Sequence, residues 1–127
     1  MPQQTVLIVD DDADIRDAVT AALEDEGYTV CSAVGGTVLR IAQETPPPDV
    51  ILLDVMMPHV DGAKLSQLLR ANPRTAQIPI VAMTALPQRN VPTGLRYDAW
   101  LGKPFDLANL FTVIDTVTKR PTPTPTP

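Results

Sequence analysis

Polar side chains that could do chemistry stand directly after several apolar runs of this 127-residue chain. Asp10–Asp12 follows the first run, Asp54 ends "DVILLD", Thr84 ends "IPIVAMT", and Lys103 follows "AWLG". A carboxylate such as Asp54 beside a buried segment is costly unless it is protonated, paired or metal-bound. Mg²⁺ would hold several carboxylates together. With Lys103 and Thr84 nearby, Asp54 could then act as the nucleophile that receives a phosphoryl group.

These residues need strands to position them, and the hydrophobic pattern predicts five strands alternating with helices. We expect strands at 5–9, 28–33, 49–54, 78–83 and 99–102, and helices at 12–26, 37–44, 61–71 and 107–117. Leu68 and Leu107 are expected on the inward faces of their helices. The alternation predicts an α/β fold, a doubly wound five-stranded parallel sheet flanked by helices, whose strands end at the ligand-binding edge.

Composition limits the function further. The chain has a net charge of −5 and a pI near 4.6, so it offers no broad basic surface, and we expect no direct nucleic acid binding. Cys31 is the only cysteine, so no intrachain disulfide forms, and we expect it to pack as a small hydrophobe. Without a leader or membrane-spanning run, the expected location is cytoplasmic. One domain is expected over 1–119, with a Thr-Pro-rich tail or linker at 120–127.

Four motifs carry a resemblance to a known family. The segments "VLIVDDD", "DVILLDVMMPHVDG", "IPIVAMTA" and "LGKPF" resemble, in order and spacing, the receiver domain of two-component response regulators. The resemblance covers roughly residues 5 to 118 and implies a flavodoxin-like fold. It further implies a phosphorylation-activated signalling switch that takes its phosphoryl group from a histidine kinase or phosphotransfer protein, and that is not a turnover enzyme.

The resemblance also implies roles for individual residues. Asp54 would be the phosphoacceptor, Asp11 would bind Mg²⁺ directly, Asp10 would do so through water, and the backbone carbonyl of Met56 would complete the protein ligands. A helix cap is the other use of an aspartate at such a position, and we assign it to Asp12.

On the same basis, Thr84 and Lys103 would contact the phosphoryl oxygens, with a cis peptide bond before Pro104. The acidic set at the strand ends and this lysine would together form one site. An output domain or partner protein would then read the phosphorylated state.

The sequence departs from the family between Thr84 and Lys103. This stretch is short by roughly three residues, and Pro87 and Pro92 disfavour a continuous helix, so the fourth helix is expected to be short or irregular. Trp100 stands where the family usually has the Tyr or Phe that changes position with the threonine. We therefore hypothesise that the phosphorylation signal leaves through an altered surface.

Two other functions remain open at this point. A pseudo-receiver would keep the fold and bind a partner without phosphorylation, and the short fourth-helix region favours it. A phosphatase of the haloacid-dehalogenase type would use an Asp-x-Asp pattern after the first strand. Asp10 and Asp12 have that spacing, but such enzymes also need a cap and a second acidic motif.

Overall fold

A single parallel sheet forms the centre of the molecule. The computed structural model describes residues 4–34, 37–44, 46–57 and 61–118. Its five strands lie in the order β2-β1-β3-β4-β5, all parallel, which confirms the predicted architecture. The elements are β1 (Thr5–Val9), α1 (Ala13–Asp25), β2 (Thr29–Ser32), α2 (Thr37–Ala42), β3 (Val50–Asp54), α3 (Gly62–Ala71), β4 (Ile80–Thr84), a 3-10 turn η1 (Gln88–Asn90), β5 (Ala99–Gly102) and α4 (Leu107–Thr118).

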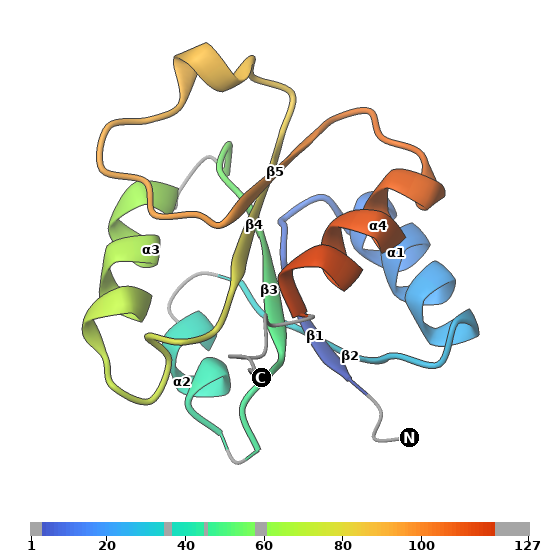
Figure 1. Cartoon of the computed structure of the whole chain (residues 1–127), viewed down its shortest axis with the longest axis horizontal. Helices are drawn as coiled ribbons and strands as arrows, with labels where there is room; N and C mark the ends of the chain where they lie inside the picture. Colours follow the sequence, from blue (N-terminus) through green and yellow to red (C-terminus); the bar gives the residue numbers. More distant parts are fainter. Residues whose placement is uncertain (1–3, 35–36, 45, 58–60, 119–127) are drawn as a thin grey trace, which may run out of the picture.

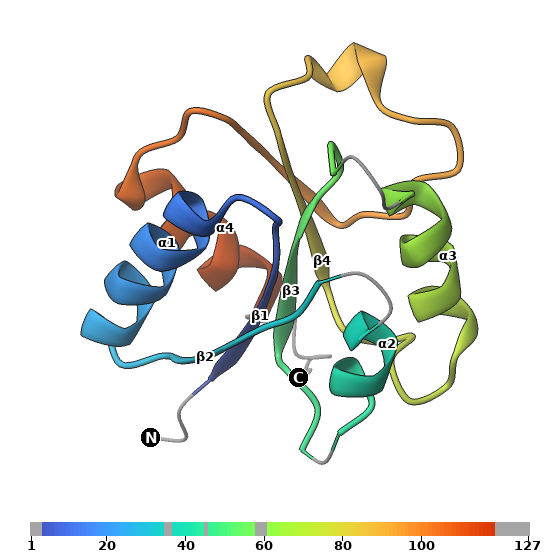
Figure 2. The same ribbon diagram turned by 180° about the vertical axis from the view of Figure 1, so that it is seen from behind.

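Helices cover both faces of the sheet. Figures 1 and 2 show α1 and α4 on one side and α2 and α3 on the other. A hydrophobic core lies on each face of the sheet, and alternate residues of β1 contribute to the two. Leu7 and Val9 pack with α2 and α3, and Val6 and Ile8 pack with α1 and α4. The same alternation runs through β3 and β4, all of whose residues are buried. A strand buried on both faces reads as a continuous apolar run, which is why Asp54 stands out in the sequence.

Local capping places the helices relative to the strand ends. The Asp12 carboxylate accepts hydrogen bonds from the backbone N–H groups of Asp14 and Ile15, as its predicted capping role requires. Asp61 caps α3 in the same way. Gly27, with a φ of 95°, follows the end of α1, where a left-handed residue lets the chain turn back toward β2.

Three predicted burials are wrong. Leu68 is 42% exposed, because it lies about 100° around α3 from the fully buried Leu69 and faces solvent. Leu107 is 49% exposed, since it is the first residue of α4. Cys31 is exposed because β2 is an edge strand that the helices cover only partly. The second helix also ends at Ala42, two residues before its predicted end.

Adjacent leucines on α3 provide a test of this packing. Leu69→Ala should lower the free energy of unfolding by about 2–5 kcal/mol, because it leaves a cavity in a core that is closed to solvent. Leu68→Ala should cost less than about 1 kcal/mol, since the side chain is already partly hydrated. Urea unfolding of both variants measures the difference. Equal losses would contradict the assigned orientation of α3.

The connection from β4 to β5 contains no α-helix. This confirms the prediction that a helix between these two strands would be short or irregular. Residues 85–98 are all described, and their only helical element is the 3-10 turn Gln88–Asn90. Figure 1 shows this segment running out beyond the sheet and returning past α3. The predicted tail at 120–127 and the outer limits of the predicted 1–119 domain lie outside the described residues. Within the described part, no helix is long and apolar enough to cross a membrane.

Candidate functional site

Three carboxylates meet at the carboxyl ends of β1 and β3. Oxygen atoms of Asp10, Asp11 and Asp54 all lie within 4.8 Å of one another. The strands bring them together because β1 and β3 are neighbours in the sheet, with Val9 paired to Leu53. Asp10 is fully buried and Asp54 is 4% exposed, whereas Asp11 is exposed. The predicted acidic cluster is therefore present and is open to solvent on the side of Asp11.

Asp10 is held by contacts on each of its oxygens. Its Oδ1 accepts a hydrogen bond from the Asp12 backbone N–H at 2.9 Å, and its Oδ2 accepts one from Lys103 Nζ at 2.8 Å. Its backbone carbonyl accepts a further hydrogen bond, at 2.8 Å, from Arg16 Nη1. Arg16 was not among the predicted site residues. Its position could have identified it. The dipole disfavours a cation in the first turn of a helix, so an arginine there suggests a specific partner.

Asp54 stands between an amide and an ammonium. Its Oδ1 accepts a hydrogen bond from the Met56 backbone N–H at 2.9 Å, and its Oδ2 lies 3.3 Å from Lys103 Nζ. Burial raises the pKa of Asp54, the Met56 amide opposes the rise, and the carboxylate of Asp10 adds to it against the opposing charge of Lys103. The net pKa is above the usual value, so negative charge at this position is costly to maintain.

The pKa of Lys103 is also raised, by its two acidic neighbours. Burial alone would lower its pKa, but the hydrogen bond to Asp10 and the charges of Asp54 and Asp10 outweigh that effect and raise it. The ammonium therefore stays charged. One ammonium does not balance three carboxylates, and hard oxygen donors around an excess of negative charge are what Mg²⁺ binds in proteins. The residues fit such an ion.

Thr84 and Met56 lie at the same edge. Thr84 ends β4, is 1% exposed, and its Oγ1 accepts a hydrogen bond from the Leu86 backbone N–H at 3.1 Å. Its carbonyl accepts the Lys103 backbone N–H at 2.8 Å, which ties β4 to the end of β5. Met56 follows Asp54 by two residues, with its side chain 57% exposed. The Lys103-Pro104 peptide bond is cis, as predicted.

Trp100 lies farther down the sheet. It pairs with Ala82, two positions before the ends of β4 and β5, on the face that α2 and α3 cover. Its half-buried ring packs edge-on against Tyr97, with ring centroids 5.4 Å apart. The structure therefore places Trp100 against the core beside the 85–98 segment and not among the carboxylates.

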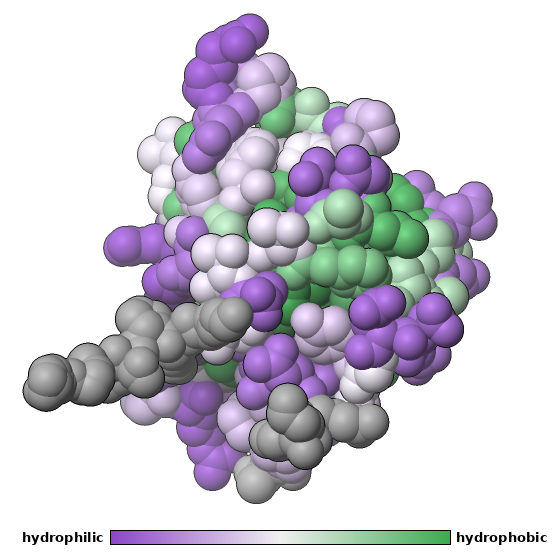
Figure 3. Space-filling view, turned by 45° about the vertical axis from the view of Figure 1, so that its right-hand side comes forward, coloured by the Kyte–Doolittle hydropathy of each residue, from purple (hydrophilic) through white to green (hydrophobic). Residues whose placement is uncertain are grey.

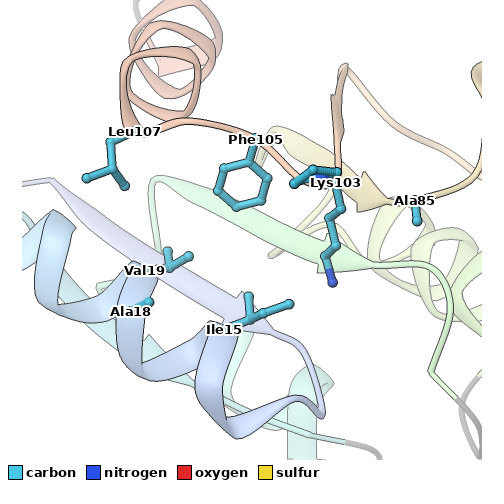
Figure 4. A pocket seen from close by; sticks show the side chains of 8 residues that line it. Ile15, Ala18, Val19, Ala85, Lys103, Phe105 and Leu107 are labelled. Carbon is cyan, nitrogen blue, oxygen red and sulfur yellow. The ribbon is translucent and has the colours of Figure 1, made fainter.

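An apolar groove adjoins the site. Its volume is about 410 Å³, and it lies between α1 and the start of α4, with Lys103 at its edge. Figure 4 shows Ile15, Val19, Phe105 and Leu107 around it, and apolar residues form a patch in Figure 3, where the side of α1 and α4 is turned forward. The charged site thus has an apolar border.

Comparisons with known proteins agree with this geometry. The family described as "Response regulator receiver domain" matches residues 6–115. The chain is 38% identical to the DNA-binding dual master transcriptional regulator RpaA of Synechocystis sp., over 91% of this chain and 49% of that protein. It is 35% identical to the phosphate regulon transcriptional regulatory protein PhoB of Pseudomonas aeruginosa, over 97% of this chain and 55% of that protein. The chain thus spans about half the length of these curated relatives.

Solved structures show the same fold. A putative response regulator from Chloroflexus aurantiacus superimposes with a TM-score of 0.85 at 29% identity, covering 94% of this chain and 100% of the other. The receiver domain of sensor histidine kinase PA1611 from Pseudomonas aeruginosa, solved with a magnesium ion coordinated in its active-site cleft, gives 0.82 at 26% identity, covering 94% and 100%. Because the family match extends over residues 6–115, well over half of the sequence, the chain belongs to the response regulator receiver domains, which are signalling domains of two-component systems.

Proposed function

We propose that this domain is switched by phosphorylation of Asp54, with a histidine kinase or a phosphotransfer protein as the phosphoryl donor. One observation carries the proposal: Asp54 ends a fully buried strand, and its carboxylate faces Lys103 at 3.3 Å beside two further carboxylates. A rigid strand holds the nucleophile in place, and the ammonium can stabilise charge that develops on a phosphoryl group.

In the transfer, phosphorus exchanges its bond to the donor for a bond to Asp54. A carboxylate oxygen of Asp54 bonds to phosphorus while the bond between phosphorus and the donor's histidine nitrogen breaks. The electron pair of that bond returns to the imidazole, which takes up a proton. Lys103 and the hydroxyl of Thr84 would donate hydrogen bonds to the phosphoryl oxygens. Later hydrolysis of the aspartyl phosphate would reset the switch, and we propose that the domain acts in this way as a signalling switch and not as a turnover enzyme.

The proposed metal is Mg²⁺. Asp10, Asp11, Asp54 and the backbone carbonyl of Met56 would hold it, with Asp10 acting through water. When bound, the cation supplies positive charge that neutralises the carboxylates and the incoming phosphoryl oxygens. The donor set of close oxygens within 4.8 Å supports this choice.

Intact-mass spectrometry after incubation with acetyl phosphate tests the proposal. We expect a gain of one phosphoryl group in Mg²⁺ and none in excess EDTA. A chain that gains no mass from acetyl phosphate or from a phosphorylated histidine donor would instead be a pseudo-receiver. The phosphatase alternative loses support because Asp12 caps α1, so the second aspartate of its motif is occupied by the helix.

We further propose that the readout passes through the 85–98 segment and α3, with Thr84 and Trp100 as the switch residues. The segment is bonded to α3 at three places. The buried Ser66 hydroxyl accepts the Arg96 backbone N–H at 2.8 Å, Gln67 Nε2 donates to the Gly94 carbonyl at 2.9 Å, and Arg70 pairs with Asp98. Movement at Thr84 would reach this unit through the Leu86 amide that its hydroxyl holds.

Ser66→Ala tests the readout. The change removes the acceptor of the Arg96 N–H and should lower the free energy of unfolding by about 1–3 kcal/mol. When Mg²⁺ and beryllofluoride bind the wild type, the hydrogen-exchange protection of residues 62–71 and of residues 91–98 should change together. In the Ser66→Ala variant, the protection of the two segments should no longer change together. Ser32→Ala, at an exposed site on β2, is the control. Changes across 85–110 with α3 unaffected would refute this route.

The domain limits and location remain proposals too. We propose a receiver domain over 1–119, with 120–127 as a linker or tail, in the cytoplasm. The relatives are named as transcriptional regulators and are about twice as long, which supports an output domain or partner that would bind DNA. With a net charge of −5, this chain would not bind nucleic acid itself.

A further inference from the structure

We propose that Arg16 is a positioning residue of the metal site, which fixes the peptide between Asp10 and Asp11. Arg16 is the fourth residue of α1 and is half-buried. Its Nη1 reaches back toward the end of β1 and donates to the Asp10 carbonyl at 2.8 Å. The inference rests on the proposed Mg²⁺ site and adds to it a residue that would touch neither the ion nor the phosphoryl group.

The backbone at this position determines where two ligands point. Asp10 is already fixed through its side chain by the Asp12 amide and by Lys103. Asp11 is exposed, and the direction of its carboxylate follows from the orientation of the peptide that precedes it. The guanidinium of Arg16 holds the carbonyl of that peptide with a charge-assisted hydrogen bond. A fixed peptide would keep Asp11 directed at the metal without a rearrangement when the metal binds.

Electrostatics alone predicts the opposite role. A cation beside a metal site repels Mg²⁺, and a cation in the first turn of a helix opposes the helix dipole. If Arg16 acted only as a charge, its removal would tighten Mg²⁺ binding. If it positions the peptide, its removal would weaken binding. The sign of the change therefore distinguishes the two roles.

Calorimetric titration of Mg²⁺ into purified variants measures that sign. Arg16→Met keeps the length of the stem and removes the donor, and we expect about tenfold weaker binding, the factor that one charge-assisted hydrogen bond is worth. Arg16→Lys retains a donor and should bind within about threefold of the wild type. Arg40→Met, which removes the same charge from the exposed face of α2, is the matched control and should bind as the wild type does.

Equal or tighter binding by Arg16→Met would overturn the inference, and so would Arg16→Lys binding as weakly as Arg16→Met. If Arg16→Met does not fold, Arg16→Ala is decided by the same sign, since alanine also lacks both the charge and the donor. A wild type that binds no Mg²⁺ would refute the proposed metal site itself. Failure of the positioning role alone would leave wild-type binding intact.

Discussion

Asp54→Asn should abolish phosphoryl uptake and at the same time raise the temperature of unfolding. An amide oxygen is too weak a nucleophile to attack phosphorus, so we expect uptake from acetyl phosphate to fall by about a thousandfold or more. Stability should rise because burial makes the Asp54 carboxylate costly and raises its pKa, and the neutral amide removes that cost. Intact-mass spectrometry and thermal unfolding measure the two effects.

The predicted gain in stability of Asp54→Asn can also be measured through the pH dependence of unfolding. Because the pKa of Asp54 is raised on folding, the folded state binds the proton more tightly than the unfolded state. The resulting stabilisation is complete below the ordinary carboxyl pKa and is lost as the pH rises through the folded pKa. The Asp54→Asn variant should not lose stability in this way as the pH rises. Asp61→Asn, which keeps a residue able to cap α3, is the control that should retain both uptake and the pH profile. A variant at 54 that is less stable than the wild type at neutral pH would contradict the electrostatic account.

Lys103→Met should lower the free energy of unfolding by about 3 kcal/mol at neutral pH, because it leaves Asp10 and Asp54 buried without their shared cation. The same change should reduce phosphoryl uptake, since the donor to the phosphoryl oxygens is gone. Saturating Mg²⁺ should recover part of the stability, since it would bind among the same carboxylates. Urea unfolding with and without Mg²⁺ measures both effects.

Lys64→Met is the matched control for Lys103→Met. Lys64 is exposed on α3, so its loss should change stability by less than about 0.5 kcal/mol and leave phosphoryl uptake unchanged. Equal stability of the Lys103 and Lys64 variants would mean that the ammonium is not paired with the buried carboxylates in solution.

Much of the fold follows from patterns that are local in sequence. The apolar run at 5–9 becomes a strand with those bounds, because a strand buried between two helical layers leaves an uninterrupted hydrophobic signal. The run at 99–102 also becomes a strand with the predicted bounds, at the edge of the sheet. Convergence of the strand ends then follows from topology alone, which is why Asp10, Asp11 and Asp54 could be assigned to one site before their distances were known.

The features that sequence patterns missed depend on tertiary contacts. Apolar periodicity includes Leu68 and Leu107, but only the position of the sheet determines which part of a helix stripe is covered. The two prolines at 87 and 92 predict the loss of a helix, but they do not specify that the segment is bonded to α3 through Ser66. Arg16 was missed because its partner is a backbone carbonyl, which has no signature in the side-chain pattern.

Chemical reduction can show directly whether Asp54 itself carries the phosphoryl group. Sodium borohydride reduces an aspartyl phosphate to homoserine, so tandem mass spectrometry of digested, borohydride-treated protein identifies the modified position. We expect homoserine at residue 54 alone after incubation with acetyl phosphate and Mg²⁺. Homoserine at Asp10 or Asp11, or a phosphoryl mass gain with residue 54 unaltered, would contradict the assignment of the phosphoacceptor.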